Sequence, residues 1–114
     1  MDDCVFCKIA SGKIPAKKVY EDGLLVAFHD ILPKAPVHVL VVPKIHITSA
    51  NELHNLDDSL ASHILKLLPK LAEMLEVSDS GYRVVVNCGE NGGQSVDHLH
   101  FHLLGGRAMM WPPG

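Results

Sequence analysis

Length, composition and charge exclude several classes of protein. The 114 residues fit one domain, residues 1–114, and a hydrophobic fraction of 47% predicts a folded core. A net charge of −3, with 10 basic and 13 acidic residues well mixed, argues against a nucleic-acid-binding protein. With no signal peptide, no apolar run that could span a membrane and only three cysteines, we expect a cytoplasmic protein without disulfides.

The first half of the chain predicts a short helix, a hairpin and a central strand. Residues 5–10 fit a helix that ends at Gly12, which suits a left-handed cap. Residues 18–20 and 24–28 flank Asp22-Gly23, a pair typical of β-hairpins. Residues 37–42 form a nearly continuous apolar run that is rich in β-branched residues, which indicates a central strand.

The second half predicts one long helix and two strands. Leucine and isoleucine recur at helical spacing from Asp57 or Asp58 to about Val77, and Pro69 within this run is expected to kink the helix. A strand over residues 83–88, a polar loop over 89–95 and a strand over 98–104 follow. Together these elements predict an α+β fold with a five-stranded, largely antiparallel sheet, one long helix and one short helix.

Three of the eight histidines alternate along the last predicted strand. Because alternate side chains of a strand share a face, His98, His100 and His102 are expected on one face, about 6.6–6.8 Å apart, with Leu99 and its apolar neighbours facing the core. Asp97 is expected on the core side or at an edge, opposite the histidines. Packing alone explains an imidazole-lined face poorly, so we expect a functional one.

Two chemistries suit such a face. A His-x-His pair on a strand can hold a metal ion that activates water. Alternatively, one imidazole attacks phosphorus while its neighbours and nearby polar groups hold the phosphoryl oxygens. The second is favoured, because the adjacent residues supply hydrogen-bond donors and no acidic cluster for magnesium; the candidate donors are Asn87, Gln94, Ser95 and the amides around Gly92 and Gly93.

The run from His98 to Leu104 matches the histidine triad pattern, and most of the chain resembles the Hint branch of that family. The matching motifs include Phe6-x-Lys8-Ile9, Ala27-Phe28-His29-Asp30-Ile31, Ala35-Pro36-Val37-His38, Gly92-Gly93-Gln94-Ser95-Val96 and the terminal Trp111-Pro112-Pro113-Gly114. The resemblance implies a homodimeric hydrolase that cleaves the P–N bond of purine nucleoside 5′-phosphoramidates and needs no organic cofactor. Asp97, where many relatives have an aromatic residue, and Met110, where some have histidine, depart from the pattern.

The same resemblance assigns roles to individual residues. It implies that His100 is the nucleophile, that His102 contacts the phosphate and helps to protonate or orient the leaving amine, and that His38 supports His100. By the same match Ser95 and Asn87 bind phosphate oxygens, beside Gly93 and Gln94, and Asp30 with Ile31 lies at the ribose. Phe6, Ile9 and Phe28 line the base pocket; ordinary core positions for these three, and a turn role for Asp30, are the alternatives.

Cys4 and Cys7 form a Cys-x-x-Cys pair, which suits one side of a tetrahedral zinc site. Some bacterial relatives with this pair bind zinc through both cysteines, a later histidine and the first triad histidine, which implies Cys4, Cys7, His46 and His98 here. Two free thiols are the alternative. His29, His54 and His63 match no role and are expected at the surface.

Two other functions remain open from the sequence. One is a nucleotide-sensing or adaptor protein in which hydrolysis is incidental. The other is a diadenosine polyphosphate hydrolase of the Fhit branch, against which His102 argues, because that branch typically has glutamine at the third triad position.

Overall fold

Five strands form one sheet in which every pairing is antiparallel, which confirms the predicted fold class. In this computed structural model, which describes residues 3–114, the strands lie in the order β1-β2-β3-β5-β4. Their bounds are β1 Lys18–Glu21, β2 Leu25–His29, β3 Val37–Pro43, β4 Tyr82–Val85 and β5 Phe101–Gly105. The strand predicted over residues 37–42 is therefore central.

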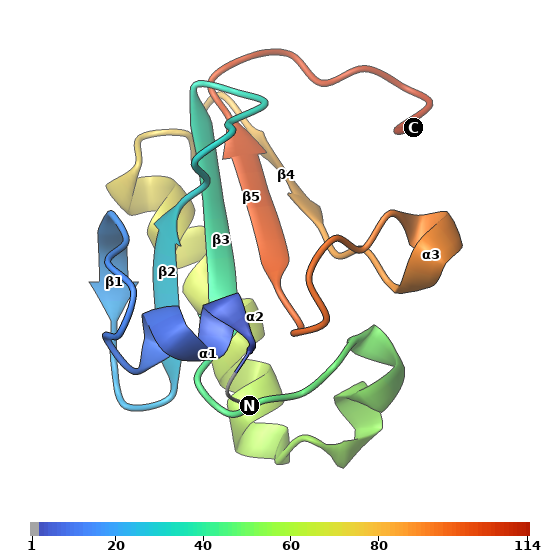
Figure 1. Cartoon of the computed structure of the whole chain (residues 1–114). Helices are drawn as coiled ribbons and strands as arrows, with labels where there is room; N and C mark the ends of the chain where they lie inside the picture. The colour runs from blue at the N-terminus through green and yellow to red at the C-terminus, as the bar shows by residue number, and fades with distance from the viewer. Residues whose placement is uncertain (1–2) are drawn as a thin grey trace.

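Helices cover both faces of the sheet. The short helix α1 (Val5–Ala10) lies on one face and the long helix α2 (Asp58–Met74) on the other (Figure 1). A 3-10 helix, η1 (Ala50–Asn55), precedes α2, and a one-turn helix, α3 (Gly89–Gly92), follows β4. Within residues 3–114 we find no helix with the length and apolar character that crossing a membrane requires.

Helix α2 buries the predicted apolar stripe against the sheet. Asp57 caps its N-terminus by accepting a hydrogen bond from the amide of Ser59, at 3.1 Å. The helix ends at Met74, earlier than predicted. Glu76 takes a left-handed conformation, which lets the amide of Val77 donate a hydrogen bond to the carbonyl of Ala72 and closes the helix. The kink at Pro69, which lies inside the helix, stays a prediction.

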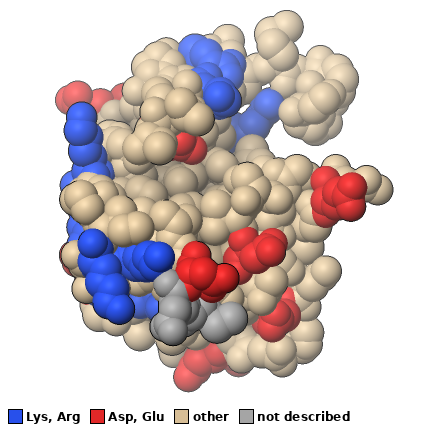
Figure 2. Space-filling view, in the orientation of Figure 1, with Lys and Arg blue, Asp and Glu red and all other residues tan. Residues whose placement is uncertain are grey.

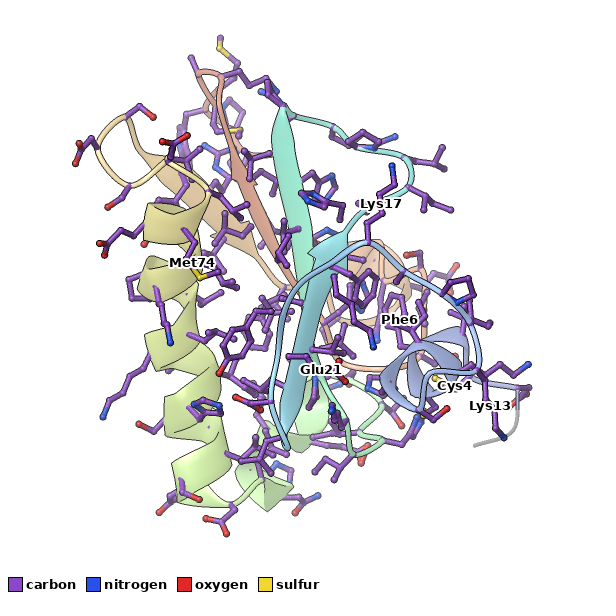
Figure 3. The ribbon with its side chains drawn as sticks, turned by 90° about the vertical axis from the view of Figure 1, so that its left-hand side faces the viewer. Cys4, Phe6, Lys13, Lys17, Glu21 and Met74 are labelled. Atoms are coloured by element: carbon purple, nitrogen blue, oxygen red, sulfur yellow. The ribbon has the colours of Figure 1, made fainter. Side chains whose placement is uncertain are left out.

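The sheet has a hydrophobic core on each face. One core lies between the sheet and α2 and contains Val39, Val41 and Leu103. The other lies between the sheet and α1 and contains Phe6 and Leu40. In Figure 3, Phe6 lies between α1 and the sheet, and Met74 marks α2 on the opposite face.

Besides the end of α2, the largest differences from the predicted elements lie between residues 83 and 104. Strand β4 ends at Val85 instead of residue 88, and the predicted loop 89–95 contains α3. Strand β5 begins at Phe101 instead of residue 98, because Phe101, paired with Val41, is the first β5 residue in register with β3. The chain bends over residues 96–98, so His98 and His100 precede the strand.

Candidate active site

The three histidines share one face although two of them precede β5. Leu99, with the alternate apolar residues after it, packs in the core beside α2. On the opposite face, the ring of Phe6 meets those of His98 and His100 edge to face, at centroid distances of 5.9 and 5.0 Å. The rings of His100 and His102 lie 5.0 Å apart. The alternation predicted from the sequence is therefore present.

His100 is held in one tautomer. Its Nδ1 lies 2.7 Å from the carbonyl oxygen of His98 and must donate to it, so in the neutral ring the proton is on Nδ1 and Nε2 keeps its lone pair. Among residues 3–114 no hydrogen bond reaches Nε2, and every fully buried side-chain nitrogen or oxygen there has a partner. Nε2 of His100 is thus open to the cavity that this residue lines.

A second chain of hydrogen bonds orients His102. The amide of Lys34 donates to Nδ1 of His38, at 3.1 Å, so the neutral His38 ring carries its proton on Nε2. That Nε2 lies 2.9 Å from Nδ1 of His102 and donates to it, which leaves the proton of His102 on Nε2. Asp30 Oδ2 lies 3.5 Å from the same His38 nitrogen.

The expected support of His100 by His38 is therefore corrected: His38 bonds the ring of His102. The register gives the reason. His38 pairs with Leu104, and Leu40 pairs with His102, so His38 lies beyond His102 on the side away from His100.

Burial disfavours the charged forms of His38 and His102. It lowers the pKa of His102 from 6.5 to about 4, with His100 and His38 adding to the effect and Asp30 opposing it. Burial also lowers the pKa of His38, partly offset by the charge of Asp30. At neutral pH the free protein thus presents His38 and His102 as neutral rings with defined tautomers.

The histidines open onto a cavity of about 1150 Å³. One part of its wall is apolar and includes Phe6, Ile9 and Phe28, which are also core residues. The wall also carries polar and charged side chains, and the predicted residues on it are Asp30, Ile31, His38, Ser95, His100 and His102. Sequence reasoning missed Leu40, although its position two residues after His38 places it on the same face, and it missed the 14–17 segment that leads into β1.

Of the predicted phosphate-loop residues, Ser95 lies on the cavity wall, whereas Asn87, Gly93 and Gln94 do not. The amide of Gln94 is engaged with main chain: Nε2 donates to Thr48 O at 2.8 Å and to Val96 O at 3.0 Å, and Oε1 accepts from the Gly89 amide at 3.0 Å. Gln94 therefore braces the loop that carries Ser95, and the expectation that it donates to phosphate is corrected.

The four predicted metal ligands come together. The Sγ atoms of Cys4 and Cys7 lie 3.3 and 3.5 Å from Nδ1 of His98, and Cys7 Sγ lies 3.3 Å from Nδ1 of His46. Ligands around tetrahedral zinc are about 3.3–3.8 Å apart for bonds of about 2.0–2.3 Å. Nε2 of His98 donates to the carbonyl of Pro43 at 2.8 Å, which leaves Nδ1 free for a metal. We name these residues the Cys/His cluster; its donor set and spacing fit zinc.

The remaining predictions have mixed outcomes. His29 and His54 are exposed as expected, but His63 is only half-exposed and its Nε2 lies 2.6 Å from Asp22 Oδ2. Asp97 lies neither on the core side nor at the edge of a strand. It is exposed in the bend before His98 and lines a second cavity of about 560 Å³ beside Cys4 and His46.

Charges of both signs share the face of the molecule shown in Figure 2. Lysine and arginine side chains lie mainly along the left side and the top, and acidic side chains lie in the lower part and at the right. Lys17, labelled in Figure 3, lies on the cavity wall. This mixed distribution suits a small charged ligand better than an extended polyanion.

Known proteins resemble the chain along most of its length. The family model described as HIT domain matches residues 11–109. A HIT family hydrolase from Legionella pneumophila has 51% sequence identity and a TM-score of 0.95, over 98% of this chain and 100% of that chain. A histidine triad nucleotide-binding protein from Candida albicans has 39% identity and a TM-score of 0.81, over 96% and 83% of the two chains. Protein HitA of Neisseria gonorrhoeae is 43% identical over 105 residues, which are 92% of this chain and 97% of that protein.

Proposed function

The chain belongs to the HIT domain family, and on that premise we propose that it is a purine nucleoside 5′-phosphoramidate hydrolase of the Hint branch. The observation that carries the proposal is the bond from His100 Nδ1 to the His98 carbonyl, which leaves Nε2 as an unprotonated nucleophile at the cavity. The fold is that of HIT family hydrolases. Histidine at position 102 favours the Hint branch over the Fhit branch.

The cavity suggests how the nucleotide binds. Phe6, Ile9 and Phe28 offer an apolar surface for the purine. Asp30 and Ile31 lie on the wall toward the histidines, where the ribose would lie. The α-phosphate would then contact Ser95, His100 and His102.

In the first step, the lone pair on His100 Nε2 forms a bond to phosphorus while the P–N bond breaks. The leaving amine departs with a proton from Nε2 of His102. Because the phosphate charge favours a cationic imidazole, we assign to the His38–His102 pair the uptake of one further proton when the nucleotide binds, so that His102 is neutral after its Nε2 proton has passed to the amine. The product of the step is a nucleotidyl group on His100.

In the second step, water attacks the same phosphorus and the bond to His100 breaks. The proton of the attacking water passes to Nε2 of His102, which restores the state before the amine left. The nucleoside monophosphate leaves, and His100 regains its lone pair on Nε2. The sum of both steps is phosphoramidate plus water giving nucleoside monophosphate plus amine.

A homodimer is part of the proposal. Strand β4 is the last strand of the sheet, and no other strand among residues 3–114 pairs with its outer edge. Tyr82, Val84 and Val86 on and beside it are 37–38% exposed. An open edge with exposed apolar side chains invites pairing with another strand, and a second copy would continue the sheet with two-fold symmetry.

The proposed metal is a structural zinc ion in the Cys/His cluster, which supplies all four ligands and leaves no position for substrate. It would tie α1 to the sheet, and no organic cofactor is part of the proposal. Thiolate ligands require reduced cysteines, which supports the proposed cytoplasmic location. We treat residues 1–114 as a single HIT domain without a nucleic-acid or membrane partner.

The test compares substrates and one variant. Wild-type protein should hydrolyse adenosine or guanosine 5′-phosphoramidate far faster than diadenosine polyphosphate. His100→Asn should lose at least about a thousandfold in kcat while still binding AMP, and His54→Asn, at an exposed histidine, should match wild type. Unchanged turnover by His100→Asn would refute the proposal, and a stoichiometric protein partner released by purine monophosphate would favour the adaptor alternative.

A further inference from the structure

The buried side chain of His98 connects the Cys/His cluster to His100. Its Nδ1 lies 3.3 Å from Cys4 Sγ and 3.5 Å from Cys7 Sγ. Its main-chain oxygen accepts the 2.7 Å hydrogen bond from His100 Nδ1. One fully buried residue, 0% exposed, therefore contacts both the metal-binding thiols and the proton that sets the tautomer of His100.

The sheet does not hold this part of the main chain. Pairing with β3 ends at Phe101, and pairing with β4 ends at His102. Before those residues, Nε2 of His98 donates to Pro43 O at 2.8 Å, and the Leu99 amide donates to Ile47 O at 2.7 Å. The position of the His98 carbonyl thus depends on contacts of the His98 side chain as well as on one neighbouring main-chain bond.

The same thiols also fix the helix that packs on His100. Cys4 is the N-cap of α1, and its Sγ accepts from the Cys7 amide at 3.4 Å. Phe6, between these cysteines, packs on both His98 and His100, and Figure 3 shows Cys4 and Phe6 close together at the start of α1. The cluster is therefore connected to His100 in two ways: through the main-chain carbonyl of His98 and through Phe6 of α1.

We infer that His98 is a positioning residue for the nucleophile. When the Cys/His cluster holds a metal ion, the His98 side chain is fixed at Nδ1 and Nε2, and its carbonyl keeps the proton of His100 on Nδ1. The inference rests on the proposed function and adds to it a link between metal occupancy and the rate of the chemical step. Loss of the metal should lower kcat and leave nucleotide binding almost unchanged, because the base and ribose contacts lie elsewhere in the cavity.

The test uses Cys7→Ser, which removes a thiol that contacts His98 and leaves the triad intact. Cys88→Ser makes the same exchange at a cysteine outside the cluster and is the matched control. Each protein is prepared with Zn²⁺, its metal content is measured, and kcat and KM are determined with adenosine 5′-phosphoramidate. The ring tautomer of His100 is read from ¹⁵N chemical shifts of the imidazole nitrogens.

We expect Cys7→Ser to lose zinc and to lose about 10- to 100-fold in kcat, as for other residues that support a reacting group. Its KM and its Kd for AMP should stay within about twofold of wild type. The His100 signals should show Nδ1–H in zinc-loaded wild type and both tautomers in Cys7→Ser. Cys88→Ser should behave as wild type in every measurement.

An unchanged Nδ1–H tautomer in zinc-free protein would overturn the inference, as would a raised KM with unchanged kcat. If Cys7→Ser does not fold, chelator-treated wild type, before and after Zn²⁺ is restored, gives the same comparison. If wild type hydrolyses no phosphoramidate, the proposed function fails, but the tautomer comparison still decides whether His98 positions His100.

Discussion

Nε2 of His38 lies 2.9 Å from Nδ1 of His102, and this contact crosses from β3 to β5 on the face of the sheet that bears α1. The amide of Lys34 fixes the proton of His38 on that nitrogen. His102 consequently presents an N–H, whereas His100 presents a lone pair. These two neighbouring imidazoles thus differ in role. The His98 carbonyl sets the tautomer of His100, and the Lys34 amide sets the tautomer of His102 through His38.

Replacement of His38 should impair His102 without removing the nucleophile. His38→Phe keeps a ring in this buried position but removes the donor to His102 Nδ1, so His102 can carry its proton on either nitrogen. We expect kcat to fall about 10- to 100-fold with little change in AMP binding. Steady-state kinetics and calorimetry check this, with His54→Phe as the exposed control; a change in KM alone would assign His38 to binding.

Stability should fall in acid because of the buried imidazoles. The pKa of His102 is about 4 in the folded protein against 6.5 ordinarily. Between these values the unfolded chain binds a proton that the folded chain does not, so stability is fully present above about pH 6.5 and is lost as pH falls toward about 4. Each unit of this shift corresponds to at most about 1.4 kcal/mol.

His102→Gln removes this titration, so its Tm should fall less than that of wild type between about pH 7 and pH 4.5. His38, whose pKa is also lowered by burial, leaves a residual slope in the variant. Thermal unfolding followed by circular dichroism measures both slopes, and His54→Gln is the control. Equal slopes in wild type and His102→Gln would contradict the assignment.

Local patterns in the sequence predict most of the fold. The hairpin forms where Asp22-Gly23 predicts it, because the Asp22 carboxylate accepts hydrogen bonds from the amides of Leu24 and Leu25, both at 2.8 Å. The histidines alternate with apolar residues even before β5 begins, because the apolar residues between them are buried against α2. Both features depend on residues close together in the sequence.

Contacts between distant segments account for the errors. The partner of His38 depends on the register between β3 and β5, which no local pattern states. The side-chain amide of Gln94 forms hydrogen bonds with main-chain groups of Thr48 and Gly89. A residue that was expected to donate a hydrogen bond to phosphate therefore braces a loop. The two histidine ligands could be named only through the resemblance, because His46 and His98 lie far from the cysteines in the sequence.

Purified protein should contain about one zinc ion per chain, held by two thiolates and two imidazoles. A strong chelator should then lower the Tm of wild type, because metal binding contributes to the stability of the folded state. Cys4→Ser should start at the lower Tm and respond little to chelator, whereas Cys88→Ser should respond as wild type. Elemental analysis and thermal unfolding test this. If metal-free wild type had the same Tm as the purified protein, the alternative of two free thiols without a structural metal would be supported.

The open edge of β4 should form the dimer interface. Val84→Lys places a charge on each copy beside the two-fold axis, so we expect the dimer Kd to rise at least about tenfold. Leu65→Lys, on the exposed side of α2, is the control for an added surface charge. Sedimentation velocity over a concentration series measures both, and an unaltered dimer in Val84→Lys would place the interface elsewhere.

The most direct test of the account is a mass spectrum of wild-type protein quenched during turnover in alkaline denaturant, in which a phosphorus–imidazole bond survives. Trypsin should release residues 84–107 as one peptide, ending at Arg107 and containing all three triad histidines, so fragmentation can assign the modified ring. We predict a nucleotidyl group on His100 that is absent from His100→Asn. A nucleotidyl group on His102, or turnover without any modified histidine, would contradict covalent catalysis by His100.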